Sequence, residues 1–295
     1  MVHKQRVLCV VGDLVEDIVV HSTVTTVRDT DNRSRIERQR GGSAANVAVA
    51  AAVAGAAVRF IGRVGDDAVG QRLEAELVAA GVDARVQRCD RTGAIVVVVE
   101  PGGARTMFPD RAAAAELGAI DASWASGVTW LHVPAYSLCA EPIGTSTQAF
   151  VRRVRAGGAG LSIDVSSVAI VEEFGTAAFA ALVRALDPNV VFATVEEAAA
   201  VLGAGQAAAV LGARMVVKDG PRPVTLRHAD GRVEQVAVLA VDGVVDTTGA
   251  GDAFAAGFLV ATLDGAGPVA AVAAGAALAA RTLLLPGAAL APRGP

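Results

Sequence analysis

A run of small residues between two acidic ones has the composition needed for phosphoryl transfer. Gly249-Ala250-Gly251 follows Asp246-Thr247-Thr248 and precedes Asp252. Small side chains let a backbone approach a phosphate, and the first N–H groups of a helix are unpaired and lie at the positive end of its dipole. A carboxylate in this position can take the proton of an attacking hydroxyl, which typically accelerates a reaction by about 10²- to 10⁴-fold. We therefore expect an anion hole with Asp252 beside it as a base.

A second pair of glycines precedes another helix-like segment. Gly41-Gly42 is followed by Ser43-Ala44-Ala45-Asn46. The functional interpretation places the Gly42 backbone and the Asn46 side chain on substrate hydroxyls. Each motif taken alone has a plainer interpretation: a tight turn, an acid that complements a helix dipole, or an amide satisfied in the core.

The segments that must position these motifs alternate between strand and helix patterns. Such alternation predicts an α/β fold, with a mostly parallel sheet covered by helices on both faces. A short strand-like run, Val244-Val245, leads into the Asp246 motif. The other expected strands are 6–11, 58–62, 94–100, 106–108, 128–133, 161–165, 190–192, 213–218, 224–227 and 232–238, and the expected helices are 43–54, 68–80, 146–156, 172–186, 196–202, 253–263 and 269–284.

Two segments differ from this rhythm. Residues 21–40 alternate Val and Thr before becoming polar and charged, and Pro101-Gly102-Gly103 is a hairpin signal between two strand-like runs. We expect segments of about 14–40 and 91–109 to form a small β-sheet lid. No linker divides the chain, so residues 1–295 are expected to form one domain.

Composition narrows the function classes. The 295 residues have a formal net charge of −4, and no basic run is present, which argues against nucleic-acid and anionic-membrane partners. The alanine-rich stretches 47–58 and 269–285 are expected to be buried helices rather than membrane spans. Three widely spaced cysteines and no signal peptide favour a cytoplasmic protein with reduced thiols.

Other catalytic chemistries find little support. The four histidines show no metal-ligand spacing, and neither a Gly-x-x-x-x-Gly-Lys-[Ser/Thr] loop nor a Gly-x-Ser-x-Gly elbow occurs. His132 lies in an apolar strand pattern, which is more typical of a satisfied core histidine than of a ligand.

The two glycine motifs together resemble a known family. Residues 41–65 are similar to the first signature of the ribokinase-like (PfkB) carbohydrate kinases, and residues 246–259 to the second. The resemblance covers essentially the whole chain. It implies an ATP-dependent kinase with a Rossmann-like α/β core and a β-sheet lid over the sugar. It also assigns the base to Asp252 and the anion hole to Gly249, Ala250 and Gly251.

The resemblance further implies substrate contacts. Asp17 matches the family's acid that binds substrate hydroxyls, although a solvated charge at a strand end is the plainer alternative. Gly42 and Asn46 match other substrate contacts. Arg105 lies where sugar kinases of this kind often read Arg-Thr, and it could meet an acidic sugar, the phosphates or only solvent.

The nucleotide and ion sites depart from the family pattern in places. The Asn-x-x-Glu element near Mg²⁺ corresponds to Thr194 through Glu197, with threonine in place of asparagine, so Glu197 is expected to act through a metal-bound water. Lys218 and Gly220 match the nucleotide end, where Pro223 replaces a glycine. Asp246, Thr248 and the loop Pro286-Gly287-Ala288 resemble a K⁺ site, although Ala291 stands where some relatives have serine.

The resulting hypothesis is a kinase that transfers the γ-phosphate of ATP to a hydroxymethyl group of a small sugar such as ribose, fructose or a sugar acid. Two alternatives stay open: a nucleoside kinase of the same fold, and a catalytically silent ligand-binding homologue. Aromatic residues make up only 4% of the chain, which favours free sugars over nucleosides. Exposed lid strands have edges that need covering, and we expect a homodimer through the lid.

Overall fold

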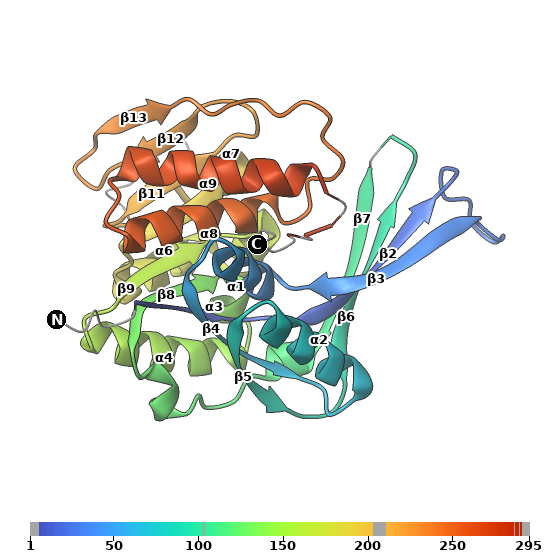
Figure 1. Ribbon diagram of the computed structural model, residues 1–295, viewed down its shortest axis with the longest axis horizontal. Helices are drawn as coiled ribbons and strands as arrows, with labels where there is room; N and C mark the ends of the chain where they lie inside the picture. The colour runs from blue at the N-terminus through green and yellow to red at the C-terminus, as the bar shows by residue number, and fades with distance from the viewer. Residues whose placement is uncertain (1–5, 103, 203–210, 286, 289, 291–295) are drawn as a thin grey trace.

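The computed structural model describes residues 6–102, 104–202, 211–285, 287, 288 and 290, and its centre is a nine-stranded sheet (Figure 1). The strand order is β13-β12-β11-β10-β9-β8-β1-β4-β5. The strands from β11 to β5 run parallel, whereas β12 and β13 form an antiparallel edge. Their bounds are β1 Val7–Val11, β4 Ala57–Val64, β5 Val82–Arg88, β8 Val128–Pro134, β9 Gly160–Asp164, β10 Val190–Thr194, β11 Arg214–Lys218, β12 Val224–Arg227 and β13 Val233–Val236.

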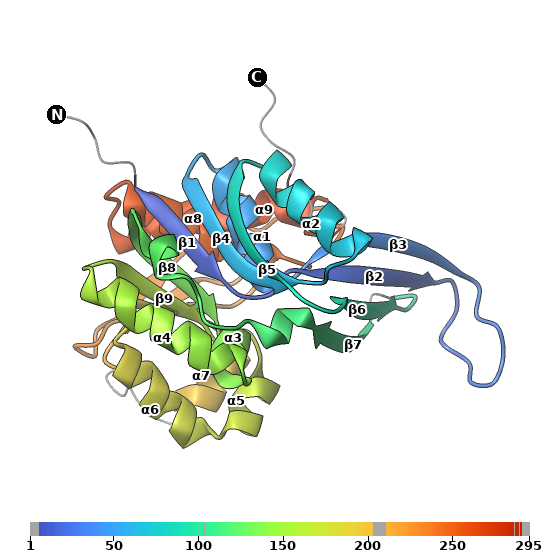
Figure 2. The same ribbon diagram turned by 90° about the horizontal axis from the view of Figure 1, so that it is seen from below.

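Helices cover both faces of this sheet (Figure 2). The strand β1 explains why, because Leu8 and Val10 pack into one apolar cluster while Cys9 and Val11 pack into a second one on the opposite face. The first cluster is closed by α1 (Ser43–Val53), α2 (Ala68–Ala79), α8 (Ala250–Leu263) and α9 (Pro268–Leu283). On the other face lie α3 (Tyr136–Cys139), α4 (Ile143–Ala156), α5 (Val168–Phe174), α6 (Thr176–Leu186) and α7 (Val195–Leu202).

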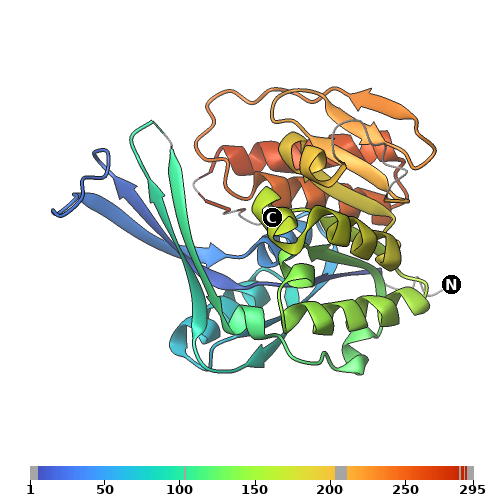
Figure 3. The same ribbon diagram turned by 180° about the vertical axis from the view of Figure 1, so that it is seen from behind.

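A separate four-stranded sheet projects from one end of the core (Figure 3). Its order is β3-β2-β6-β7, with β2 Val15–Ser22, β3 Ser34–Gly41, β6 Thr92–Val99 and β7 Arg105–Ala112. The side chains of Val15, Val19, Ile95 and Val97 form a small apolar cluster with Ala114. Gly103, within the predicted hairpin turn, lies outside the described residues.

Two local expectations were wrong, and one strand was not predicted. The predicted helix 172–186 is two helices, because Gly175 adopts φ +90° between α5 and α6. The predicted strand at Val244-Val245 is irregular backbone, and these side chains are 47% and 62% exposed. The edge strand β5 was not expected, because its half-exposed sequence VDARVQR lacks an apolar run.

The alanine-rich helices are core elements. Residues Ala44 to Ala51 of α1 are all buried, and small side chains let α8 and α9 pack closely, since a Cβ on Gly257 would lie 2.7 Å from the Ala274 carbonyl oxygen. Within the described residues, no helix is both long and apolar enough to cross a membrane.

Candidate active site

The carboxyl ends of three parallel strands bring together charged side chains that lie far apart in the sequence. The strand register pairs Phe192 with Asp164 and Thr194 with Lys218, so Asp164, Thr194 and Lys218 meet at one edge of the sheet. The Lys218 ammonium donates to Asp164 Oδ2 at 2.9 Å, and both side chains are largely buried. Burial alone would lower the pKa of Lys218, but the attraction of Asp164 raises it, so the lysine remains charged.

The N-terminus of α8 faces this edge. Gly249 caps the helix in a left-handed conformation with φ +74°, and a Cβ there would lie 2.6 Å from the Ala288 Cβ. Ala250 and Gly251 follow in the first turn. The Ala250 N–H donates to the Thr247 carbonyl at 3.3 Å, and Gly251 occupies a first-turn position whose N–H has no acceptor in a regular helix. A Cβ on Gly251 would lie 3.4 Å from Lys218 Nζ, so a fixed cation stands beside these donors. The arrangement suits an anion.

Asp252 occupies the same first turn and is held by α1. Ser43 Oγ donates to Asp252 Oδ1 at 2.7 Å, and Asn46 Nδ2 donates to Oδ2 at 3.0 Å. Burial raises the pKa of Asp252 from its ordinary value of 3.8 to about 7; the repulsion of Asp164 adds to this, while the two hydrogen bonds and Lys218 oppose it. A carboxylate with this pKa can accept a proton at neutral pH.

Arg40 orients the asparagine that contacts Asp252. Its Nη1 donates to Asn46 Oδ1 at 2.6 Å, which leaves the Asn46 amide N–H groups directed at the acid. The sequence hypothesis did not include Arg40, Ser43 as a contact of Asp252, or Asp164. The available signals were an acid that ends the apolar run of β9 and an arginine directly before the glycine pair.

Asp17 lies on β2, a strand of the four-stranded sheet. Burial raises its pKa to about 6, the nearby Asp13 adds repulsion, and its buried Oδ1 has no hydrogen-bond partner among the described residues. A Cβ on Gly41 would lie 2.0 Å from that Oδ1, and one on Gly42 would lie 2.4 Å from the Asp13 carbonyl oxygen. The absence of side chains at both glycines therefore leaves space beside the Asp17 carboxylate and the Asp13 carbonyl, and we refer to this space as the polar recess.

A cationic side chain that the sequence hypothesis missed also borders this recess. Arg111 lies 3.6 Å from Asp13 Oδ2 and stacks 4.0 Å from the centre of the Tyr136 ring. That ion-pair contact is made by its buried Nε, which has no hydrogen-bond partner among the described residues. A donor without a hydrogen bond and the Asp17 oxygen without one are complementary to a ligand that carries hydroxyl groups.

Thr194 and Glu197 bond to each other at the start of α7. The Thr194 N–H donates to Glu197 Oε2 at 2.8 Å and the Glu197 N–H donates to Thr194 Oγ1 at 3.3 Å, which is a capping box. Burial and the neighbouring Asp164 raise the pKa of Glu197. Within the described part of the chain, no group of three or more His, Cys, Asp or Glu side chains is arranged to hold a metal ion. These residues therefore fit only an indirect contact with Mg²⁺, through its water shell.

Of the remaining predicted residues, Gly220, Asp246 and Thr248 lie in loops and Arg105 lies at the start of β7. Gly220 is exposed with φ +56° in the turn after β11, where the Arg222 N–H donates to the Asp219 carbonyl. Arg105, on β7, bonds to Asp246 and Thr248 in the loop before α8. The contacts of Arg105 thus lie in the loop before α8, whereas Asp17 lies on the four-stranded sheet beside Gln39 and Ile95.

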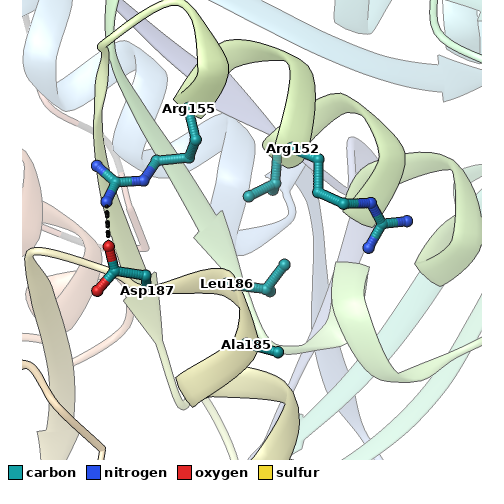
Figure 4. A pocket seen from close by; sticks show the side chains of 6 residues that line it. Arg152, Arg155, Ala185, Leu186 and Asp187 are labelled. Carbon is teal, nitrogen blue, oxygen red and sulfur yellow. Dashed lines mark hydrogen bonds and ion pairs between the residues drawn. The ribbon is translucent and has the colours of Figure 1, made fainter.

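A hollow of about 390 Å³ lies elsewhere, between α4 and α6 (Figure 4). Arg155 bonds to Asp187 there at 2.8 Å, and Arg152 points away from that pair. The charge of Arg155 is neutralised by Asp187. Arg155 also bonds to Asn189, which directly precedes β10, so this hollow lies near the amino end of that strand. It shares no residue with the cluster around Asp252.

Comparison with known proteins identifies the family of this chain. Residues 5–293 match the pfkB family of carbohydrate kinases. A fructokinase of Klebsiella pneumoniae is 32% identical over 263 residues, which cover 85% of this chain and 82% of that one. A fructokinase of Escherichia coli is 32% identical over 265 residues, with the same coverage.

Solved structures share the fold. Adenosine kinase from Sinorhizobium meliloti superposes with a TM-score of 0.85 at 22% identity, covering 97% of this chain and 95% of that one. Fructokinase with bound ATP from Xylella fastidiosa superposes with a TM-score of 0.81 at 23% identity, covering 96% of this chain and 93% of that one. The predicted α/β fold with a second small sheet is confirmed. The chain belongs to the pfkB family of carbohydrate kinases.

Proposed function

We propose that this protein is an ATP-dependent sugar kinase that phosphorylates a hydroxymethyl group, with fructose as the first candidate acceptor. The observation that carries the proposal is Asp252, a carboxylate with a pKa of about 7 in the first turn of a helix whose N-terminus is lined by glycines and a buried lysine. The fructokinase relatives support the choice of sugar.

The proposed reaction uses the two sides of the site together. The sugar oxygen attacks the γ-phosphorus, its proton passes to an Asp252 oxygen, and the bond between the γ-phosphorus and the bridging oxygen of ADP breaks. The N–H groups of the Gly249–Gly251 turn, with Lys218 beside them, stabilise the negative charge on the transferred group. A base with a pKa near the working pH combines a useful ionised fraction with a useful basicity.

The acceptor is proposed to lie between Asp252 and Asp17. Asp17 would accept hydrogen bonds from sugar hydroxyls through its Oδ1, and the Nε of Arg111, which makes no hydrogen bond among the described residues, would donate to another sugar oxygen. Gly42 and Asn46 complete this end. We further propose that residues 1–295 act as one domain in which the four-stranded sheet is a lid, whose closure excludes water from the γ-phosphate.

The nucleotide is proposed to lie over the carboxyl ends of β10 and β11, near Thr194, Lys218 and Gly220. Bound Mg²⁺ would neutralise phosphate charge, and Glu197 would hold one of its waters. Because Thr194 is engaged in the capping box, it supports Glu197 rather than reaching outward.

One observation bears on the nucleoside alternative. Adenosine kinases share the fold, but a nucleoside site needs an apolar or aromatic surface for the base. In this chain the face of the Tyr136 ring is occupied by Arg111. This contact favours a free sugar.

An ADP-release assay across fructose, ribose, sugar acids and adenosine tests the proposal. We expect turnover with a sugar and a loss of at least about 100-fold in kcat for Asp252→Asn, since a positioned base contributes about 10²- to 10⁴-fold. Asp230→Asn, an exposed acid in the β12–β13 turn, is the control and should keep full activity. Turnover of adenosine alone would select the nucleoside kinase, and ATP binding without turnover would select the silent homologue.

A homodimer in the cytoplasm completes the proposal. Three described cysteines are free, as a reducing compartment requires. Ile36 on β3 and Met107 and Phe108 on β7 are 57–62% exposed on the two edge strands of the lid. A monomer in sedimentation at micromolar concentration would exclude the dimer.

A further inference from the structure

An arginine of the lid bonds to the loop that leads into the anion hole. Arg105 Nη1 donates to Thr248 Oγ1 at 2.7 Å and its Nη2 donates to Asp246 Oδ1 at 2.5 Å. The Arg105 and Asp246 side chains are 30% and 20% exposed, so the pair is only partly open to water. Thr248 directly precedes Gly249, the cap of α8.

Asp246 is already surrounded by donors. Its Oδ1 also accepts from the Thr248 N–H and hydroxyl, both at 2.8 Å, and its Oδ2 accepts from the Gly287 N–H at 3.0 Å. A K⁺ ion needs free oxygen lone pairs, yet the side-chain oxygens of Asp246 and Thr248 contact N–H groups and a guanidinium that would repel it. The described residues therefore do not fit the monovalent cation that the family resemblance implied. Pro286 and Ala291, which belong to the same comparison, lie outside the described residues.

We propose that Arg105 is a tethered cation that takes the place of a monovalent ion at Asp246 and Thr248. This inference rests on the proposed kinase function. The guanidinium neutralises Asp246 and bridges two oxygens with fixed geometry, which a mobile ion does not do. It thereby holds the residue before Gly249 in place and joins the lid strand β7 to the phosphate side of the site.

The arrangement makes Arg105 a positioning residue. Loss of its side chain removes the one ion pair of the Asp246 carboxylate among the described residues, and it frees side-chain oxygens to which a dissolved cation could then bind. An ion supplied from solution should restore what the missing guanidinium did. The wild-type protein should gain nothing from the same ion, because its place is taken.

The experiment compares sugar phosphorylation in KCl, in NaCl and in tetramethylammonium chloride, whose cation is too large to enter. Wild-type rates should agree within about twofold. Arg105→Ala should lose about 10- to 100-fold in kcat/KM in tetramethylammonium chloride, the effect expected of a displaced loop. Potassium or about 20 mM guanidinium should restore most of the kcat/KM that Arg105→Ala loses. The kcat/KM of Arg105→Lys in tetramethylammonium chloride should lie between those of Arg105→Ala and the wild type. Arg91→Ala, which removes an exposed arginine paired with Asp110 on the same sheet, should behave as wild type in every salt.

A thermal-unfolding series in the same salts separates this inference from the kinase assignment. The unfolding midpoint of Arg105→Ala should rise in KCl relative to tetramethylammonium chloride, and that of the wild type should not. Wild-type turnover that needs K⁺ by more than tenfold, or an Arg105→Ala protein that responds to no cation in either measurement, would overturn the tethered-cation proposal. Failure to phosphorylate any sugar would overturn the kinase assignment and leave the unfolding series to decide the role of Arg105.

Discussion

Replacing Ser43 by alanine should raise the pKa of Asp252 and shift the pH dependence of the reaction. Ser43 Oγ donates to Asp252 Oδ1 at 2.7 Å and stabilises the ionised acid. A hydrogen bond to a charged group contributes about 1.5–3 kcal/mol. Since 1.36 kcal/mol corresponds to one unit, the pKa should rise by about one to two units, from about 7 to about 8–9.

This shift sets the size of the loss at each pH. At pH 7 the ionised fraction falls from about one half to about 1–10%, so kcat/KM should fall by about 5- to 50-fold and recover most of the loss above pH 9. The assay is kcat/KM from pH 5 to 10, with Ser34→Ala, an exposed lid serine, as the control. Asp17, whose pKa is about 6, should affect the acidic part of the kcat/KM profile equally in the wild type and in Ser43→Ala. A Ser43→Ala loss that is equal at every pH would refute the reasoning and assign Ser43 a purely geometric role.

Two further substitutions test the phosphate side. Gly249→Ala should reduce kcat/KM by at least about tenfold, because the φ of +74° disfavours a side chain and the new Cβ would lie 2.6 Å from Ala288 Cβ. Gly265→Ala is the control. Its φ of +91° carries the same backbone strain, but the space around it is open, so this variant should keep its activity. Asp252→Asn should become more stable relative to wild type as pH rises from 5 to 8. The folded state raises the pKa of Asp252 from 3.8 to about 7, so wild type is favoured at low pH and loses stability as the acid ionises. Unfolding midpoints against pH measure this difference, and a constant offset would contradict it.

The sequence was sufficient for features that depend on local pattern. Glycines before a helix, an acid in its first turn and alternating strands and helices each follow from short-range chemistry, and they predicted the parallel sheet and the α8 turn. The roles of Asp17, Asn46, Lys218 and Asp252 stay predictions, although the structure gathers Asn46, Lys218 and Asp252 around one helix end.

Features that depend on topology were not readable. Ser43 and Asp252 are 209 positions apart, and only the packing of α1 against α8 brings them into contact. Arg105 likewise meets Asp246 across 141 positions. At Gly175 and in β5, the local pattern was ambiguous, because a single glycine is compatible with a helix and an edge strand exposes half of its side chains.

The burial of α1 has a consequence for biosynthesis. Its eight consecutive buried residues, Ala44 to Ala51, join the same apolar cluster as α8 and α9, which are translated well after α1. At about 5–20 residues per second, the ribosome needs about 10–40 s to deliver α8 after α1 has emerged. During that interval the apolar surface of α1 is not yet covered by α8 and α9, so the nascent chain exposes a surface to which chaperones can bind. The contact between Ser43 and Asp252 can form only after both α1 and α8 have been made.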